Sequence, residues 1–449
     1  MVCRKGKHIM KKCVIGILLV AALLTGCDNT TQEPTPMPAP TPQLSLEVPQ
    51  ETVYVLQDAT YTIPAKLLQD GEEVSDAILT YESSDTDILT VSGSGMVTPV
   101  AVGNAKVTVN YFNAGLSKTV SITVVQKANP TKLTEDCFAF EGRNQISANE
   151  VVLYNTASSV EMMIYGTGAE MTLQGSMDSL KIRVFVDGVD CGVQTLLRGA
   201  QKVAVAKDLS EGVHNIKVVK VNSAHYGSIT LKGLPVATGG YLLNWEKPQR
   251  LVLEIYGDSI TAGYGIFGEA NSVSQEDGTL TYAYLAAQEL NAEVHIQAHG
   301  GISLFIPMWN TETMLNNYQY ISPGVNTLEY TDKAYTPDVI LINLGTNDVS
   351  GIQRGKGNNA SLKYGIAQFA RALREENPDA KIVFCYGMMS DYLYEVIQTG
   401  VENVNAEVEN CYFYRMDEVS VTGYNEHPDV EGNAQAADGL VKYLRTILN

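Results

Sequence analysis

Histidine, cysteine and tryptophan are scarce in this chain. Its 449 residues include six histidines, seven cysteines and two tryptophans, and no two cysteines form a CxxC pair. Metal centres are built mostly from clustered cysteine, histidine and carboxylate ligands. We therefore expect no metal site. A disulfide between Cys137 and Cys191 stays open at this point, because spacing alone does not decide it.

Basic residues are also few: 31 stand against 50 acidic residues, and the net charge is −19. Five of the basic residues lie within residues 1–26, so without this segment the balance is 26 against 50, or −24. A protein this acidic has no electrostatic basis for binding nucleic acid. The apolar fraction of 45% and the length instead indicate several packed globular domains.

The start of the chain is typical of a targeting segment. Basic residues precede an apolar run, 14–24, that is too short to span a bilayer comfortably. The tetrapeptide Leu24-Thr25-Gly26-Cys27 then resembles a bacterial lipobox. This resemblance implies a signal peptide over 1–26, a lipidated Cys27, and a protein anchored on the outer side of a bacterial cell membrane. The alternative is an ordinary signal peptide with a chance cysteine.

A polar, proline-rich segment, 27–44, follows and predicts an extended tether. Residues 45–126 then show short alternating stretches about ten residues apart, which predicts a β-sandwich. The segment from Tyr81 to Val109 resembles bacterial Ig-like domains of group 2. Residues 133–240 again lack a helical period, and we expect a second β-sandwich of jelly-roll type there.

From residue 249 the pattern changes to alternating strands and helices, which predicts an α/β domain over 249–449 with a parallel sheet flanked by helices. The expected strands are 250–256, 293–298, 338–344, 381–387 and 411–416. The expected helices are 279–290, 360–375, 389–402 and 431–448.

Four polar turns of this domain carry a consistent chemistry, and parallel topology should bring them to one sheet edge. Ser259, in Gly-Asp-Ser-Ile, supplies a hydroxyl nucleophile, and His427 supplies a base. Oxyanion donors could be the N–H of Ser259, the N–H of a glycine in the turn after the second strand, and the side-chain amide of Asn347. For that glycine we favour Gly300 over Gly301.

These turns resemble the SGNH/GDSL hydrolase superfamily, from about residue 250 to the end. With the β-sandwich ahead of it, including HNIKVVKVNSAHYGSITLKG and then LEIYGDSITAGYG, the chain resembles carbohydrate esterase family 2 from about residue 133. The resemblance implies an enzyme that removes acetyl groups from polysaccharides such as xylan or glucomannan through a serine acyl-enzyme, without a cofactor.

The sequence departs from the superfamily beside the histidine. Tyr424 and Asn425 stand where an aspartate would usually orient the imidazole. We therefore expect a Ser–His dyad with a backbone carbonyl or a neighbouring side chain accepting the Nδ1 proton. Glu426 and Asp429 are nearby, but we expect both to point to solvent.

Other residues near the turns have weaker assignments. Trp309 and His299 are candidate substrate contacts, although Trp309 could equally be packed and a structural role for His299 is favoured. Asp258 and Asp348 are expected to hydrogen-bond backbone amides, and His295 is expected to be packed within its strand. Two other functions stay open: another acyl hydrolase such as a lysophospholipase or thioesterase, and a non-catalytic glycan-binding protein of the cell surface.

Overall fold

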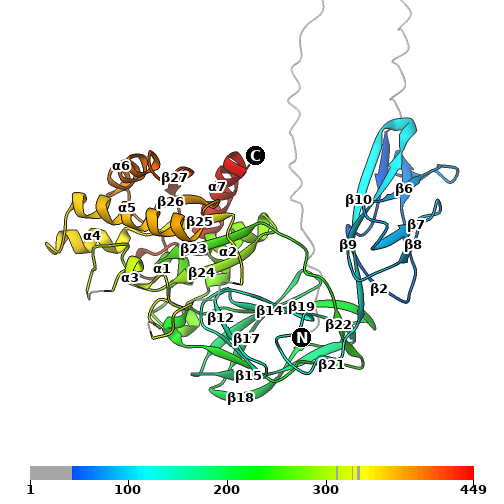
Figure 1. Cartoon of the computed structure of the whole chain (residues 1–449), viewed down its shortest axis with the longest axis horizontal. Helices are drawn as coiled ribbons and strands as arrows, with labels where there is room; N and C mark the ends of the chain where they lie inside the picture. The colour runs from blue at the N-terminus through cyan, green and yellow to red at the C-terminus, as the bar shows by residue number, and fades with distance from the viewer. Residues whose placement is uncertain (1–42, 310–311, 326, 331–333, 449) are drawn as a thin grey trace, which may run out of the picture.

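The computed structural model describes residues 43–309, 312–325, 327–330 and 334–448. The expected signal peptide, Cys27 and most of the tether lie outside them. Three domains follow in chain order. The second domain lies at the bottom of Figure 1, with the α/β domain above it on the left and the first domain above it on the right. Among the described residues, no helix is both long and apolar enough to cross a membrane.

The first domain is the predicted Ig-like sandwich, and its buried residues alternate along the strands, as in β9. The strand β2 pairs in parallel with β10, which also pairs antiparallel with β9. The ten strands are β1 (Leu44–Glu47), β2 (Thr52–Leu56), β3 (Tyr61–Thr62), β4 (Lys66–Gln69), β5 (Glu72–Glu73), β6 (Thr80–Ser83), β7 (Leu89–Val91), β8 (Met96–Pro99), β9 (Gly103–Tyr111) and β10 (Leu116–Lys127).

The second domain packs two antiparallel sheets around an apolar core. One sheet contains β11 (Phe138–Glu141), β14 (Ser159–Gly166), β16 (Leu180–Val186), β17 (Val189–Leu196), β19 (Gly212–Lys220) and β22 (Tyr241–Asn244). The other contains β12 (Asn144–Ile146), β13 (Glu150–Leu153), β15 (Gly168–Gly175), β18 (Gly199–Ala206), β20 (Ile229–Lys232) and β21 (Val236–Thr238).

Strand β22 lies past the expected end of the second domain at residue 240, and it joins the first two domains. Gln126 and Lys127 of β10 pair with Asn244 and Leu243 of β22, so one sheet continues from the Ig-like domain into the second domain. Cys137 is a free, buried thiol, so it forms no disulfide with Cys191.

The third domain is a parallel sheet in the order β24-β23-β25-β26-β27. Its strands are β23 (Val252–Gly257), β24 (Glu293–Ala298), β25 (Val339–Asn343), β26 (Lys381–Met388) and β27 (Cys411–Glu418). The order reverses between β23 and β25, which is where ligands bind in open α/β sheets.

Helices cover both faces of this sheet, and their apolar sides form two separate cores. The core with α2 (Tyr282–Glu289) and α7 (Val430–Leu448) lies on one face, and that with α5 (Asn359–Glu376) and α6 (Tyr394–Asn405) on the other. Helix α6 begins five residues after the predicted position, because β26 continues to Met388 and residues 389–393 form a turn before the helix. The short helices α1 (Ser259–Ala262), α3 (Met314–Asn317) and α4 (Thr346–Gln353) were not predicted.

Candidate functional site

The four polar turns meet at the carboxyl edge of the parallel sheet. Strand β23 ends at Gly257, and α1 begins at Ser259. A Cβ on Gly257 would lie 2.0 Å from Thr261 Oγ1, so only glycine allows this tight passage from strand to helix. Asn347 lies in the first turn of α4, just after β25, and His427 precedes α7.

Ser259 and His427 are in direct contact across 168 residues of sequence. The Nε2 atom of His427 lies 2.8 Å from Ser259 Oγ. On the other side of the ring, Nδ1 lies 3.0 Å from the Tyr424 carbonyl oxygen and 3.2 Å from that of Asn425. With Nδ1 protonated and donating to these oxygens, Nε2 is free to accept the serine proton.

The backbone before His427 has an unusual conformation that directs these carbonyls. Asn425 and Glu426 have φ of 54° and 58°, in the left-handed region that side chains rarely adopt. The Tyr264 ring packs beside the imidazole, with ring centroids 4.8 Å apart. Burial lowers the pKa of His427, and the two carbonyls act in the opposite direction. A lowered pKa keeps the imidazole neutral, and able to accept a proton, at neutral pH.

The two acidic neighbours of the histidine do not orient it. Glu426 is exposed, as expected. The expectation for Asp429 is wrong: its carboxylate accepts hydrogen bonds from the Ser420 and Thr422 hydroxyls and from the Gly432 N–H at 2.8 Å. Asp429 therefore ties the segment before His427 to the first turn of α7.

Two buried aspartates support the nucleophile side of the site. Asp258 caps α1 by accepting from Ile260 N at 3.0 Å, and burial raises its pKa to about 7, with the charge of Asp348 adding to the effect. Asp348 accepts from three successive backbone N–H groups, those of Leu304, Phe305 and Ile306, at 2.7, 2.9 and 2.7 Å. Burial raises the pKa of Asp348 to about 6.

The predicted oxyanion donors differ in the hydrogen bonds and contacts that they already make. Asn347 Nδ2 donates to the Ile302 carbonyl at 2.9 Å and, more weakly, to Asp258 Oδ2 at 3.3 Å. An oxyanion would compete with the second, longer bond. Neither Gly300 nor Gly301 has a heavy atom within 4 Å of where a Cβ would lie, so the backbone there is open to a ligand. The space around the backbone is the same at both positions, so it favours neither Gly300 nor Gly301 as the oxyanion donor.

His299 joins the site to the second domain. Its ring meets that of His225 edge to face, with centroids 5.5 Å apart, and burial together with the charge of His225 lowers the pKa of His299. His225 lies in a short 3₁₀ turn, η2 (Ala224–Tyr226). Its closeness to the site was not predicted, because no local pattern connects segments 74 residues apart in sequence.

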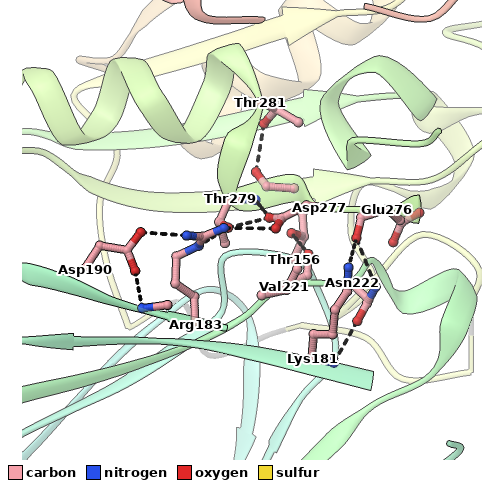
Figure 2. A network of polar contacts seen from close by, with 12 residues as sticks. Thr156, Lys181, Arg183, Asp190, Val221, Asn222, Glu276, Asp277, Thr279 and Thr281 are labelled. Carbon is pink, nitrogen blue, oxygen red and sulfur yellow. Dashed lines mark hydrogen bonds and ion pairs between the residues drawn. The ribbon is translucent and has the colours of Figure 1, made fainter. Parts of the chain in front are cut away.

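A buried polar network holds this part of the second domain against the loop before α2 (Figure 2). Arg183 Nη2 contacts Asp277 Oδ2 at 3.0 Å, and Lys181 Nζ donates to the Glu276 carbonyl at 2.8 Å. The Glu276 carboxylate accepts from Ser223 N at 2.5 Å, directly before η2. The network thus helps to hold η2, and with it His225, beside His299.

Trp309 is exposed at the surface, whereas His295 is buried. Trp309 is 64% exposed, and the Arg354 guanidinium lies 3.8 Å from its ring centroid, so the side chain is not part of a core. His295 is buried and packed as predicted: it stacks on Tyr335 and accepts from Gly142 N at 2.9 Å.

In the described part of the chain, no group of three histidine, cysteine or carboxylate residues is placed to hold a metal ion.

Three family models match successive parts of the chain. Residues 44–124 match the bacterial Ig-like domain (group 2), residues 140–245 the carbohydrate esterase 2 N-terminal domain, and residues 255–421 the GDSL-like lipase/acylhydrolase family. The first match begins one residue before the predicted Ig-like domain, the second ends five residues after the predicted second domain, and the third lies within residues 249–449.

Curated relatives of the chain are named as esterases. The chain is 27% identical over 310 residues to the cellulase/esterase CelE of Acetivibrio thermocellus, a match that covers 65% of this chain and only 37% of CelE. It is 24% identical over 352 residues to an acetylxylan esterase/glucomannan deacetylase of Cellvibrio japonicus, covering 76% of this chain and 96% of that protein.

Solved structures share the fold of the second and third domains. A family two carbohydrate esterase from Clostridium thermocellum, in complex with cellohexaose, matches with a TM-score of 0.64 and 25% identity over 69% of this chain and 99% of that one. The acetyl xylan esterase Est2A from Butyrivibrio proteoclasticus matches with a TM-score of 0.65 and 22% identity, over 73% and 99% of the two chains.

Proposed function

We propose, for a chain that joins an Ig-like domain, a carbohydrate esterase 2 N-terminal domain and a GDSL-like hydrolase domain, that it is a serine esterase removing acetyl groups from polysaccharides or oligosaccharides. The observation that carries the proposal is the 2.8 Å contact between Ser259 Oγ and His427 Nε2 at the carboxyl edge of the sheet. The names of the relatives support acetylated xylan or glucomannan as the substrate class.

In the proposed reaction, Ser259 Oγ attacks the acetyl carbonyl carbon while its proton passes to His427 Nε2. The C–O bond to the sugar then breaks, and the sugar hydroxyl leaves with the proton from the imidazolium. Water attacks the acetyl-enzyme with the same proton transfers, releasing acetate and restoring the Ser259 hydroxyl. The carbonyls of Tyr424 and Asn425 hold Nδ1–H and so stabilise the charged ring while it carries the proton.

The oxyanion of the tetrahedral intermediate is proposed to lie among the N–H of Ser259, the N–H of Gly300 and the amide of Asn347. Asn347 fits this role because its bond to Ile302 fixes the side chain, while its longer bond to Asp258 can be exchanged for the substrate oxygen.

The glycan is proposed to lie across the rim that holds Trp309 and His299. Trp309 is exposed and held in place: Lys356 donates to its carbonyl at 2.9 Å and Arg354 lies over its ring. A fixed, exposed aromatic ring suits packing against the C–H face of a sugar. We further propose that Cys27 is lipidated and that residues 27–44 hold the domains away from the outer surface of the bacterial membrane.

Release of acetate from acetylated xylan, acetylated glucomannan and acetylated cell-wall glycan, compared side by side, tests the function and the substrate together. We expect release from a plant polysaccharide, and a loss of at least about 10³-fold in kcat for Ser259→Ala. Absence of release from all three polymers, or an unchanged rate for Ser259→Ala, would contradict the proposal. Faster turnover of octanoyl than of acetyl nitrophenyl ester would favour a lipid substrate instead.

A further inference from the structure

A cavity of about 530 Å³ lies where the three domains meet, and the proposed reaction does not use it. Tyr54 of β2 contributes from the Ig-like domain, Glu161 and Lys217 from the second domain, and Gln288 of α2 from the third; Arg250, in the connection to β23, also lines it. Its volume falls within the range of about 300–1,000 Å³ typical of small-molecule sites.

This cavity lies at the opposite edge of the sheet from Ser259. Asn291 and Ala292, which line it, directly precede β24, and Arg250 precedes β23, whereas Ser259 follows the last residue of β23. Strand β23 has six residues, which span roughly 20 Å at about 3.3 Å each. A molecule in the cavity would therefore be remote from the Ser–His pair.

Several polar side chains of the cavity wall are held in place by hydrogen bonds. Asn215 Nδ2 donates to Glu161 Oε1 at 2.9 Å, and Lys217 Nζ donates to Glu141 Oε2 at 2.7 Å, so these buried side chains are held in place. Glu161 Oε2 is buried without a hydrogen-bond partner in the described chain. The Arg250 guanidinium contacts Glu141 and Glu161 only at 3.9 and 4.0 Å, beyond hydrogen-bond distance.

An aromatic residue of the Ig-like domain also lines the cavity. Tyr54 lines the cavity, and its pKa is raised to about 12, first by burial and then by the charges of Glu161 and Asp187. Tyr54 and the carboxylates Glu161 and Asp187 thus line the same cavity from two domains. Phe185 adds a second ring to the wall.

We infer that this cavity is a second ligand site that binds a short, neutral oligosaccharide. A sugar hydroxyl both donates and accepts, so it can donate to the carboxylate of Glu161 and accept from Arg250. The rings of Tyr54 and Phe185 offer faces for C–H packing, and the Tyr54 hydroxyl can donate to a sugar oxygen. An anion would be repelled by Glu161 and Asp187, and a cation by Arg250 and Lys217, which favours a ligand without net charge.

Such a site would hold glycan through the junction of the Ig-like domain and the esterase, independently of catalysis. The inference does not depend on the proposed function, because it uses none of the residues at the Ser–His pair. It gives the Ig-like domain a direct part in glycan binding, through β2, β9 (with Asn104 and Lys106) and β10.

Isothermal titration calorimetry of the full chain with cellohexaose, xylohexaose and mannohexaose tests the site. We expect at least one to bind, and Tyr54→Ala to raise its Kd by about tenfold, the effect typical of an aromatic anchor. The matched control is Tyr61→Ala, another half-buried tyrosine of the Ig-like domain that lies outside the cavity; its Kd should match wild type. Hydrolysis of nitrophenyl acetate should be unchanged in both variants.

Two further measurements separate this site from the catalytic rim and from misfolding. Trp309→Ala should leave the Tyr54-dependent binding unchanged. Tyr54→Phe keeps the ring and removes only the hydroxyl, and it should raise Kd by about three- to tenfold even if Tyr54→Ala is unstable. The inference fails if none of the three sugars binds, if binding depends on Trp309 alone, or if both Tyr54 variants bind as wild type does.

Discussion

The two halves of the Ser–His pair are supported in different ways. On the serine side, the buried carboxylates of Asp258 and Asp348 hold the backbone of α1 and of the loop after β24. On the histidine side, two backbone carbonyls hold the imidazole, and the nearby Asp429 binds hydroxyls and an amide instead. The chain thus uses its carboxylates to position backbone and leaves the orientation of the base to the main chain.

Removing the base should have the largest effect on kcat. We expect His427→Ala to lower kcat on acetyl esters by roughly 10²- to 10⁴-fold, since general-base catalysis contributes about that much. Steady-state kinetics with nitrophenyl acetate would measure it. His295→Ala is the control for loss of a histidine outside the site, and a similar fall in kcat for both variants would contradict a specific role for His427.

On the serine side, Asp348→Ala should destabilise the fold. The buried N–H groups of Leu304 and Ile306 and the partly buried N–H of Phe305 would lose their acceptor, and a buried unsatisfied group costs about 1–3 kcal/mol. We expect a lower free energy of unfolding by at least that amount, with a lower kcat because the same loop carries Gly300. Denaturant unfolding would measure the change.

Asp391→Ala provides the matched control, because Asp391 is an exposed aspartate on the neighbouring loop after β26. It should leave the free energy of unfolding within about 0.5 kcal/mol of wild type. Equal stability of the two variants would show that Asp348 is not a support of the site.

Local sequence signals were sufficient to predict which polar turns share one edge of the sheet. A polar turn after each buried strand, with parallel topology, predicted that Ser259, Asn347 and His427 approach one another. The missing aspartates at Tyr424 and Asn425 predicted a carbonyl or a neighbouring side chain as the partner of Nδ1. The structure contains two carbonyls in that position, 3.0 and 3.2 Å from the ring.

Other features could not be predicted, because they depend on contacts between distant segments. The left-handed conformation of Glu426 is not favoured by its residue type, so nothing local indicates which carbonyls turn toward the ring. The meeting of His225 with His299 requires the docked second domain, and β22 was missed because it pairs with strands from two domains.

A carboxylate introduced beside the imidazole would give the histidine side the kind of support that Asp258 and Asp348 give the serine side. Asn425 already has φ of 54°, a conformation that aspartate also tolerates, so Asn425→Asp should fold normally. We expect a change in kcat of less than about tenfold, and a raised pKa for His427, because a nearby negative charge favours the protonated ring. Glu426→Gln, which removes an exposed carboxylate, is the control and should leave the pH profile unchanged.

The smallest effect concerns the acid side of the wild-type pH profile. Only the neutral imidazole accepts the serine proton, so the rate should fall as the pH drops through the pKa of His427, which burial places below the usual 6.5. Burial also raises the pKa of Asp258 to about 7 and that of Asp348 to about 6, so a fall in rate at low pH does not by itself identify the group that is protonated. The Asn425→Asp variant resolves this: a limb that moves to higher pH belongs to His427, whereas a limb that stays in place belongs to the buried aspartates, and His427 would then not be the titrating base.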